Sequence, residues 1–444
     1  MLKKKGSWLI SAWLVMVLIL SFALSGCAGG GQSASPSASA TPTGTQTSTA
    51  STGAVKEVKI GFVWPLSGGS ASIGKEHNDG ALMAIDEINQ NGGIKSLGGA
   101  KIVPVVADSQ TKPDVGCTQV ERLITQEKVS IVVGCYNSSV TFPASEVAER
   151  YQTPFISQGG VKNEITQRGF KWVFRVNNME DYDVKETFDA IDSFIKETGQ
   201  GPKTFALLYE STDWGMGYAF GCKREGLKRG WTCVLDEPYT EGVSDMTPMV
   251  LKIKSANPDI LFVASYTPDA ILFQKAMYEN KVYIPFGIQA SGGGHQDPAF
   301  FAAVPPESVA YLFVQDDWDS SLPKKYDWVA KIGEEVKAKL GYEMNDFFAQ
   351  GWTAAYVAYF ALEKAGSTDK EAIRKALTEL DLTFPSGHAL LTGVKGIKFD
   401  NTGQNIYIGG TISQRSADGK SKVVLWPPEN KEPGAQVVWP IPKP

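Results

Sequence analysis

The amino-acid sequence predicts an α/β fold with two lobes, each built on a parallel β-sheet with helices on both faces. Short apolar segments, typical of buried strands, alternate with segments of helical periodicity from residue 58 to residue 290. Polar loops rich in glycine and serine separate several of these strands from the helix that follows. The chain keeps 390 of its 444 residues after position 54, which is too many for one hydrophobic core and suits two domains.

Residues 1–26 predict a signal peptide. Three lysines at positions 3–5 precede an apolar run from Trp8 to Leu24, and small residues precede Cys27. The last four residues, Leu-Ser-Gly-Cys, resemble the bacterial lipobox, in which the cysteine receives a diacylglyceryl group and becomes the first mature residue. This resemblance implies lipidation at Cys27 and a protein anchored to the cell membrane, in the periplasm or on the outer surface. An uncleaved membrane helix is the alternative, because the run is nearly long enough to span a bilayer.

Residues 27–54 predict a disordered tether between that anchor and the folded part. After Cys27 the segment contains only Ala, Gly, Gln, Ser, Pro and Thr, which cannot bury enough apolar surface to fold. The three lysines are the only charged residues before position 55, so cleavage changes the formal net charge from −5 to −8. This acidic balance, with no sustained basic run after Lys5, argues against nucleic acid or anionic lipid as partners of the folded part.

The first strand, turn and helix lie between residues 58 and 94. An apolar strand at 58–64 stops at Pro65, glycines and serines fill the loop up to residue 74, and alanines and isoleucines at 81–88 mark one helical face. Open α/β sheets hold ligands in such loops, because free backbone N–H groups and the positive helix end face the same space. We therefore expect a ligand site at this edge, although such a turn can also simply connect two elements.

The same order of strand, polar loop and helix recurs along the chain, in two series. Further strands are expected at 101–107, 130–134, 153–157, 204–209, 259–264 and 284–288. The first three continue the sheet of the first lobe, and the last three form a second parallel sheet. Two such lobes leave a cleft between them in which a small molecule can bind.

Four cysteines remain after Cys27, and an even number in an exported protein suggests disulfides. Three pairings are possible. We favour Cys117 with Cys135 and Cys222 with Cys233, because each pair joins a helix to a neighbouring strand. No metal site or cofactor is expected, since the chain has no CxxC motif and its three histidines are scattered.

No catalytic motif is apparent, and we do not expect an enzyme. The sequence contains no GxSxG elbow, Walker loop or HExxH motif, and no acid/base pair at a useful spacing. A hydrolase that uses Ser138 or Ser139 with His77 or His295 is the alternative, but these residues lack the spacing of a known triad.

Residues 61–94 carry a family resemblance. The motif comprises Ser67-Gly68, Gly74, Ala81, Ile88-Asn89 and Gly92-Gly93-Ile94, and further matches occur in the same order at 132–134, 138–144, 170–175, 213–215 and 352–355. In this the chain resembles the leucine/isoleucine/valine-binding proteins, solute receptors that feed ATP-binding-cassette importers. The resemblance spans residues 58 to about 408. It implies a binding protein for an amino acid or related small molecule, and a ligand-sensing receptor module would share the same fold.

The resemblance implies a type I periplasmic binding protein, with two Rossmann-like lobes joined by three hinge crossings. We expect the crossings near 175–177, 314–316 and 399–404. Lobe 1 would comprise 57–175 and 316–402, and lobe 2 would comprise 176–315 and 403–444. The lobes would close on the ligand, because the ligand contacts both of them only in the closed form. An ABC permease would recognise that form, and the protein is expected to be a monomer.

The resemblance also implies a set of pocket residues. Ser138 would hold a ligand carboxylate, unless it only caps the helix beginning at Ser139; Gly159 would offer a carbonyl; Trp214 and Tyr266 would cover the ligand, unless they are core residues. Ile73 stands where an aromatic residue often occurs. The full set of expected ligand-binding residues is Trp64, Ile73, Tyr136, Ser138, Ser139, Gly159, Gly160, Val161, Asp213, Trp214, Tyr266 and Gln289.

Two positions depart from the amino-acid-binding pattern. Val161 replaces a threonine, and Gln289 replaces the carboxylate that neutralises an α-ammonium group. A buried ammonium group without a counter-charge is costly, so another acid must replace it or the ligand must differ. Possible substitutes are Asp213, Asp297 and Asp316. The alternative is a different ligand, such as a short amide paired with Gln289 or an aromatic acid stacked on Trp64, Tyr136 or Trp214.

Overall fold

The computed structural model describes residues 55–318, 321–383 and 395–443. All of these residues belong to one compact unit, Thr52–Pro444. The predicted signal peptide, the lipidation site Cys27 and the tether up to residue 54 lie outside the described residues, so their predictions stay untested.

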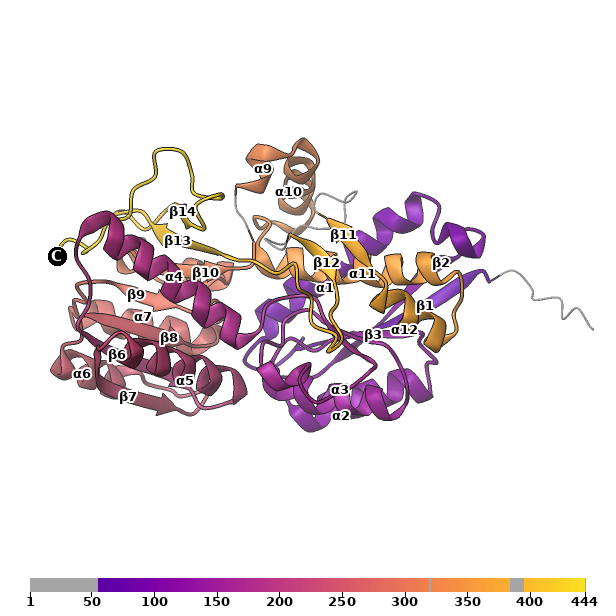
Figure 1. Cartoon of the computed structure of the whole chain (residues 1–444), viewed down its shortest axis with the longest axis horizontal. Coiled ribbons are helices and arrows are strands. Elements are labelled where there is room, and N and C mark those ends of the chain that lie inside the picture. The colour runs from indigo at the N-terminus through magenta and orange to yellow at the C-terminus, as the bar shows by residue number, and fades with distance from the viewer. Residues whose placement is uncertain (1–54, 319–320, 384–394, 444) are drawn as a thin grey trace, which may run out of the picture. The chain divides into compact units, whose positions relative to one another are not determined.

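The first sheet contains five parallel strands in the order β2-β1-β3-β4-β5. Helices α1, α2 and α3 connect the first four strands (Figure 1). The bounds are β1 Glu57–Trp64, α1 Ala71–Gln90, β2 Lys101–Asp108, α2 Pro113–Thr125, β3 Ile131–Gly134, α3 Ser138–Arg150, β4 Phe155–Ser157 and β5 Val173–Arg175, with short 3-10 helices η1 Lys95–Leu97 and η2 Asn163–Ile165.

A later part of the chain returns to this sheet. It contributes α10 Asp327–Leu340, α11 Asp346–Ala365, α12 Lys370–Thr378 and the antiparallel pair β11 Asp381–Thr383 and β12 Gly396–Lys398. Helix α11 packs closely along α1, and Gly80 permits the contact: a Cβ at this position would lie 2.1 Å from the carbonyl oxygen of Phe348. This contact brings the first turn of α11 to the carboxyl edge of the sheet.

The second sheet contains seven strands in the order β14-β13-β10-β9-β8-β6-β7. The five strands from β7 to β10 pair in parallel, as predicted, whereas β13 and β14 add an antiparallel edge that the strand pattern did not reveal. The bounds are α4 Glu180–Thr198, β6 Thr204–Glu210, α5 Asp213–Lys228, β7 Thr232–Tyr239, α6 Thr247–Ala256, β8 Ile260–Ala264, α7 Thr267–Glu279, β9 Ile288–Ala290, η3 Gly293–His295, α8 Pro298–Ala303, η4 Pro306–Val309, β10 Phe313–Asp316, α9 Leu322–Lys325, β13 Thr411–Arg415 and β14 Lys422–Trp426.

Helices cover both faces of each sheet, which explains the near-continuous apolar runs of the central strands. In β6, Phe205 and Leu207 belong to the core under α4 and α5, while Ala206 and Leu208 belong to the core under α6 and α7. All four are at most 1% exposed. Alternate residues of one strand thus stabilise two separate layers.

Three connections join the two sheets: between β5 and α4, after β10, and between β12 and β13. The first and third run side by side. The N–H of Arg175 donates to the carbonyl of Gly403 at 2.8 Å, and the N–H of Asn405 donates to the carbonyl of Arg175 at 2.9 Å. The buried Arg175 guanidinium also donates to Gln404 Oε1 at 2.6 Å and to the carbonyl of Lys162 at 2.6 Å. The predicted α/β fold with two lobes and three crossings is confirmed.

The predicted disulfides are wrong in this structure, where Cys117, Cys135, Cys222 and Cys233 are free thiols. Cys222 is buried on α5, whereas the Cys233 thiol turns to the carbonyl of Leu235 at 3.5 Å. Cys135 is buried after β3, and burial raises the pKa of its thiol well above the usual range. A protonated, buried thiol behaves as a small apolar side chain. Closeness along the chain therefore did not establish a bond.

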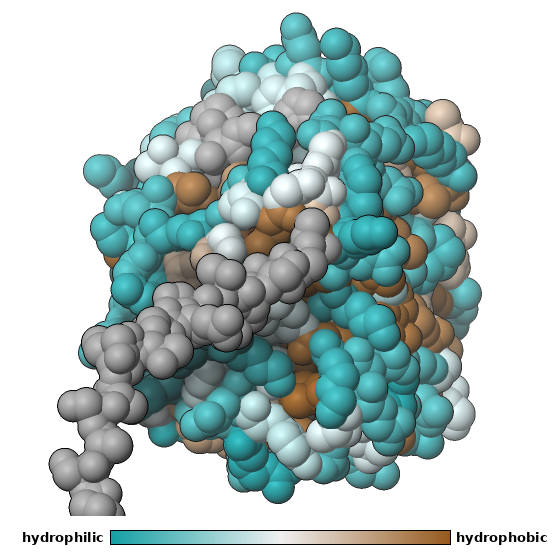
Figure 2. Space-filling view, turned by 90° about the vertical axis from the view of Figure 1, so that its right-hand side faces the viewer, coloured by the Kyte–Doolittle hydropathy of each residue, from teal (hydrophilic) through white to brown (hydrophobic). Residues whose placement is uncertain are grey.

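The surface is mainly polar where Figure 2 shows it. Outside the grey atoms, hydrophilic residues cover most of this face, and hydrophobic residues form separate patches. In the described part of the chain, no helix combines the length and apolar character needed to cross a membrane.

Candidate ligand-binding site

A cavity of about 60 Å³ lies where elements of both sheets meet. This volume holds about five water molecules, so it suits a small solute. The lining comes from the loops after β3, β4, β5, β8 and β9, from β10 and the residue after it, and from the first turns of α3, α4, α5 and α11. The lining residues are Tyr136, Ser138, Gly159, Val161, Asn177, Asp183, Trp214, Tyr266, Ser291, Gly292, Gly293, Gln296, Gln315, Asp317, Asp346, Phe347 and Gln350.

Six residues expected from the sequence line this cavity together: Tyr136, Ser138, Gly159, Val161, Trp214 and Tyr266. The loops at the carboxyl ends of parallel strands bring them to one edge, as in other α/β sites. Gly159 is needed for close packing, because a Cβ there would lie 2.6 Å from the ring of Tyr136.

Ser138 does not cap a helix. Helix α3 begins at Ser138 itself, its N-cap residue is Asn137, and no side chain caps it. The hydroxyl oxygen of Ser138 instead accepts the N–H groups of Val161 at 3.1 Å and Lys162 at 3.2 Å. Ser138 therefore fixes the loop after β4 and presents its hydroxyl at the cavity wall.

Aromatic rings form one side of the site. The ring of Tyr136 lies 6.4 Å from that of Tyr266 and 5.7 Å from that of Phe347, and Trp214 lies 4.9 Å from Tyr266. All four side chains are at most 8% exposed. Phe347 was missed in the sequence, because it belongs to a long apolar helix in which it resembles a core residue.

Trp64 and Ile73 lie behind this layer rather than in the lining. Trp64 is fully buried and stacks on His77 at 5.2 Å, and His77 in turn lies 5.1 Å from Tyr136. Ile73 is also fully buried, and its carbonyl lies 2.9 Å from Nδ1 of His77. These two residues support the aromatic side without lining the cavity.

Four other expected residues do not line the cavity. Ser139 is half-buried on α3, and the carbonyl of Gly160 accepts from Arg175 at 3.2 Å. Asp213 pairs with Lys162 at 2.7 Å. Gln289 is buried in β9, with its amide nitrogen 3.5 Å from the carbonyl of Phe286.

The three acids considered as substitutes for Gln289 have other partners. Besides Asp213, these are Asp297 and Asp316. Asp297 caps α8 and accepts the hydroxyls of Ser72 at 2.5 Å and Thr267 at 2.7 Å, while Asp316 pairs with Lys422 at 2.7 Å. The contacts Lys162–Asp213 and Ser72–Asp297 each join elements of the two sheets beside the cavity.

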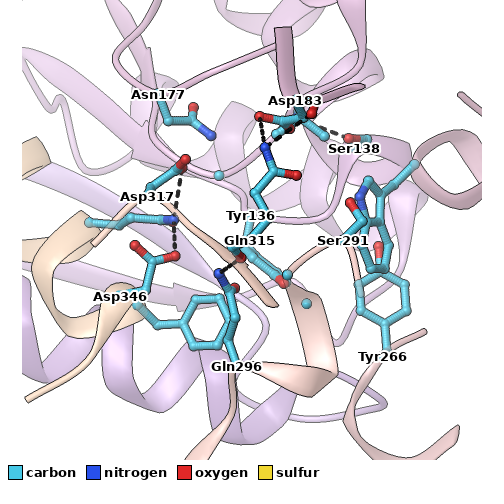
Figure 3. A pocket seen from close by; sticks show the side chains of 17 residues that line it. Tyr136, Ser138, Asn177, Asp183, Tyr266, Ser291, Gln296, Gln315, Asp317 and Asp346 are labelled. Atoms are coloured by element: carbon cyan, nitrogen blue, oxygen red, sulfur yellow. Dashed lines mark hydrogen bonds between the residues drawn. The ribbon is translucent and has the colours of Figure 1, made fainter. Parts of the chain in front are cut away.

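Three carboxylates that the sequence did not reveal also line the cavity. They are Asp183 on α4, Asp317 after β10 and Asp346 in the first turn of α11 (Figure 3). Asn345 caps α11 by accepting the N–H of Phe348 at 3.1 Å, and so fixes where Asp346 begins the helix. The polar run that follows the apolar strand β10 was the only local signal for Asp317.

Burial raises the pKa of all three acids. For Asp183 and Asp346 the pKa lies well above its usual range, and the charge of Asp317 adds to the effect of burial. The pKa of Asp317 rises to about 7, first through desolvation and then through Glu186 and Asp316. None of the described residues that line the cavity is a lysine, arginine or histidine.

A family model described as "Periplasmic binding protein" matches residues 57–407, and the chain therefore belongs to that family of solute-binding proteins. A relative named "Leu/Ile/Val-binding protein homolog 8" from Brucella melitensis is 29% identical over 363 residues, which cover 80% of this chain and 87% of the relative.

Two solved structures share the fold. LivJ from Streptococcus pneumoniae, a branched-chain amino acid transporter substrate-binding protein in complex with isoleucine, aligns with a TM-score of 0.71 at 23% identity, over 84% of this chain and 100% of LivJ. A solute-binding protein of an ABC transporter from Rhodopseudomonas palustris, in complex with 3,4-dihydroxybenzoic acid, aligns with a TM-score of 0.68 at 18% identity, over 81% and 93% of the chains.

Proposed function

We propose that this protein is an extracytoplasmic solute-binding lipoprotein of an ABC importer, which binds an amino acid or a related small molecule between its two lobes. One observation carries the proposal: a small cavity is lined by residues from the carboxyl edges of both sheets. Family membership and the relatives named for leucine, isoleucine and valine support it.

Binding would act through closure of the lobes, which we assign to 57–175 with 316–402 and to 176–315 with 403–444. A solute that touches both lobes stabilises the closed state over the open one, so its binding energy shifts the equilibrium. The cross-lobe contacts Lys162–Asp213 and Ser72–Asp297 can form only when the lobes are together. The closed form would then be the one that an ABC permease recognises.

The cavity offers a hydroxyl group to the polar part of a small solute and aromatic rings to its apolar part. The Ser138 hydroxyl lies at the N-terminus of α3, where it can donate to a carboxylate or carbonyl oxygen. Tyr136, Trp214, Tyr266 and Phe347 can cover an apolar part. The ligand-binding set we propose therefore keeps the six lining residues expected from the sequence.

We do not assign a catalytic role to this site. His77 lies within hydrogen-bond distance of the carbonyl of Ile73 and of Gln350 Oε1, so its ring nitrogens are engaged away from both candidate serines. His295 is fully buried beside Phe273 and Phe300. A serine hydrolase needs a histidine within reach of its nucleophile, and these contacts of both histidines with other groups support a binding role instead.

The membrane anchor belongs to the same proposal. Lipidation at Cys27, a tether over residues 27–54 and a monomeric folded part would let the binding protein move above the membrane while it stays near its permease. Palmitate labelling of the wild type and of Cys27→Ala in bacterial cells tests the anchor: the variant should lose the label and leave the membrane fraction.

Titration calorimetry of the purified protein with isoleucine, leucine, acetamide and 3,4-dihydroxybenzoate tests solute binding, and small-angle scattering measures closure. Saturable binding with a smaller radius of gyration supports the proposal. Conversion of a bound solute into a product would contradict it.

A further inference from the structure

Three carboxylates from separate parts of the chain meet in one small cavity. Asp183 and Asp317 flank the first and second connections between the sheets, and Asp346 comes from α11, which packs against the first sheet. Carboxylates from both sides of the cleft are therefore brought together when the lobes are closed. Like charges at close range oppose that closure unless something neutralises them.

Amide groups, not cations, are the partners of these carboxylates. The Asn178 amide donates to Asp317 at 2.9 Å, and the Gln350 amide donates to Asp346 at 2.9 Å and approaches Asp317 at 3.4 Å. Figure 3 shows the carboxyl groups of Asp317 and Asp346 facing this shared amide nitrogen. These neutral donors orient the carboxylates but do not balance their charge.

Two acceptor atoms in the lining have no partner in the structure. They are Oδ1 of Asn177 and Oδ1 of Asp346, on residues that are each 3% exposed. A buried oxygen without a donor costs about 1–3 kcal/mol. Both residues line the cavity, so a solute with N–H groups would supply the missing donors.

Several basic groups beside the cavity are occupied or neutral, and Lys162 is one of them, since it pairs with Asp213. Lys422 pairs with Asp316 at 2.7 Å, and the Arg175 guanidinium binds Gln404 and the carbonyls of Gly160 and Lys162. Behind Gln350, burial lowers the pKa of His77 to about 4, so its ring is neutral. Glu186 adds a further acid, 3.4 Å from the Gln315 amide. The cavity thus has an excess of acidic groups.

We propose that the solute is a net-positive molecule with N–H donors, such as an alkylammonium or amidinium compound, and that its cationic group lies against Asp183, Asp317 and Asp346. This inference rests on the proposed function and narrows its substrate class. The aromatic rings of Tyr136 and Trp214 would bury the alkyl part and face the cation, which they attract through their π electrons. The cavity of about 60 Å³ limits the chain to a few carbon atoms.

The N–H donors distinguish this solute from two others. A quaternary ammonium ion would satisfy the charge but leave Asn177 Oδ1 and Asp346 Oδ1 without donors. A zwitterionic amino acid would add its own carboxylate to these acids, in a cavity that offers no basic side chain in its described lining. When no cation is bound, protonation of the three acids neutralises the cavity instead. A cation must then displace these protons when it binds.

Calorimetry with five probes tests the charge class: 1,4-diaminobutane, ethanolamine, tetramethylammonium, isoleucine and acetamide. We expect the two N–H cations to bind at least about 10-fold more tightly than the other three. Because bound cations displace protons from the acids, the same titrations in buffers of different ionisation enthalpy should show proton release at pH 6.

Single variants locate the cation. Asp183→Asn, Asp317→Asn and Asp346→Asn should each weaken binding of 1,4-diaminobutane by at least about 30-fold, the usual effect of removing one partner of a buried charge pair. Asp189→Asn is the matched control, because this half-exposed aspartate on α4 pairs with Lys185 and does not line the cavity. It should leave binding unchanged. Circular dichroism and thermal melts verify that each variant is folded.

The outcomes separate the inference from the proposed function. Tight binding of isoleucine or acetamide with no binding of either N–H cation would overturn the inference and leave the solute-binding function standing. Equal binding of tetramethylammonium and 1,4-diaminobutane would overturn the role of the N–H donors. Saturable binding of none of the probes, with no solute released from the purified protein in native mass spectrometry, would contradict both.

Discussion

The two ends of the cavity differ in how they are built. The serine end, with Ser138, Gly159 and Val161, comes from loops that directly follow two neighbouring strands of one sheet. The acidic end consists of Asp183, Asp317 and Asp346. These residues lie far apart in the sequence and come from both of the proposed lobes. With the lobe bounds proposed above, the first end lies within lobe 1 in the open and the closed state alike, whereas the second would be completed only by closure. This contrast suggests that the serine end captures the solute and the acidic end selects it.

Removal of the Trp214 ring should have the largest effect, because this side chain closes the cavity from lobe 2. We expect Trp214→Ala to weaken solute binding by about 100-fold, as truncation of a buried aromatic anchor commonly does. Trp231→Ala is the matched control: both tryptophans belong to the same core and are 7% and 8% exposed, but Trp231 does not line the cavity. Equal loss of affinity in both variants, measured by calorimetry, would show that packing and not contact explains the effect.

The acidic end should make cation binding depend on pH. Since a proton and a cation compete for Asp317, whose pKa is about 7, affinity should rise about 10-fold from pH 6 to pH 8. The charged and titratable groups around it are Asp183, Glu186, Asp316, Asp346 and Lys422. Calorimetry of 1,4-diaminobutane across this range measures the slope, and Asp317→Asn should flatten it. A slope that the variant retains would assign the titration to another group.

The raised pKa values of these acids also predict how the stability of the solute-free protein depends on pH. A carboxyl group whose pKa is raised on folding binds more protons in the native state than in the unfolded state between pH 4 and pH 7. Stability therefore falls as the pH rises through this window, and the melting temperature should be a few degrees higher at pH 5 than at pH 8. Differential scanning fluorimetry measures this, and a solute-saturated sample should show a smaller difference.

Weakening the cross-lobe contacts should have a smaller effect. Lys162 and Asp213 are 21% and 35% exposed, so their ion pair contributes at most about 1 kcal/mol to closure. We expect Lys162→Met to reduce affinity about threefold, mainly by faster release of the solute in stopped-flow measurements. The exposed pair Lys185–Asp189 provides the control, Lys185→Met, which should not change the release rate.

The smallest effect is expected at Gln289, where the sequence alone predicts a gain of affinity for aliphatic amino acids upon substitution by glutamate. Because Gln289 is 3% exposed and does not line the cavity, Gln289→Glu should change binding of isoleucine less than twofold. It should instead lower the melting temperature, since it buries an unpaired carboxylate. An affinity gain would show that Gln289 reaches the solute.

Local sequence patterns predicted the fold well, because strand, polar loop and helix leave a clear signal in a few consecutive residues. At one end of the site, Tyr136, Ser138 and Gly159 could be found through the family resemblance. Asp183 and Asp346 could not, because each looks like an ordinary acidic residue in the first turn of a helix. Only the packing of α11 along α1 and the position of α4 bring them to the cavity. The antiparallel edge was missed for a similar reason, since the pairing of β13 with β10 joins residues about a hundred positions apart, and β14 pairs only with β13.

The buried guanidinium of Arg175 has a mechanical consequence. It clamps together two adjacent connecting strands and the loop that carries Val161 and Lys162. If the lobes open as proposed, rotation at these connections should carry the loop with it. Opening would then also move the part of the cavity wall at Val161 away from the solute.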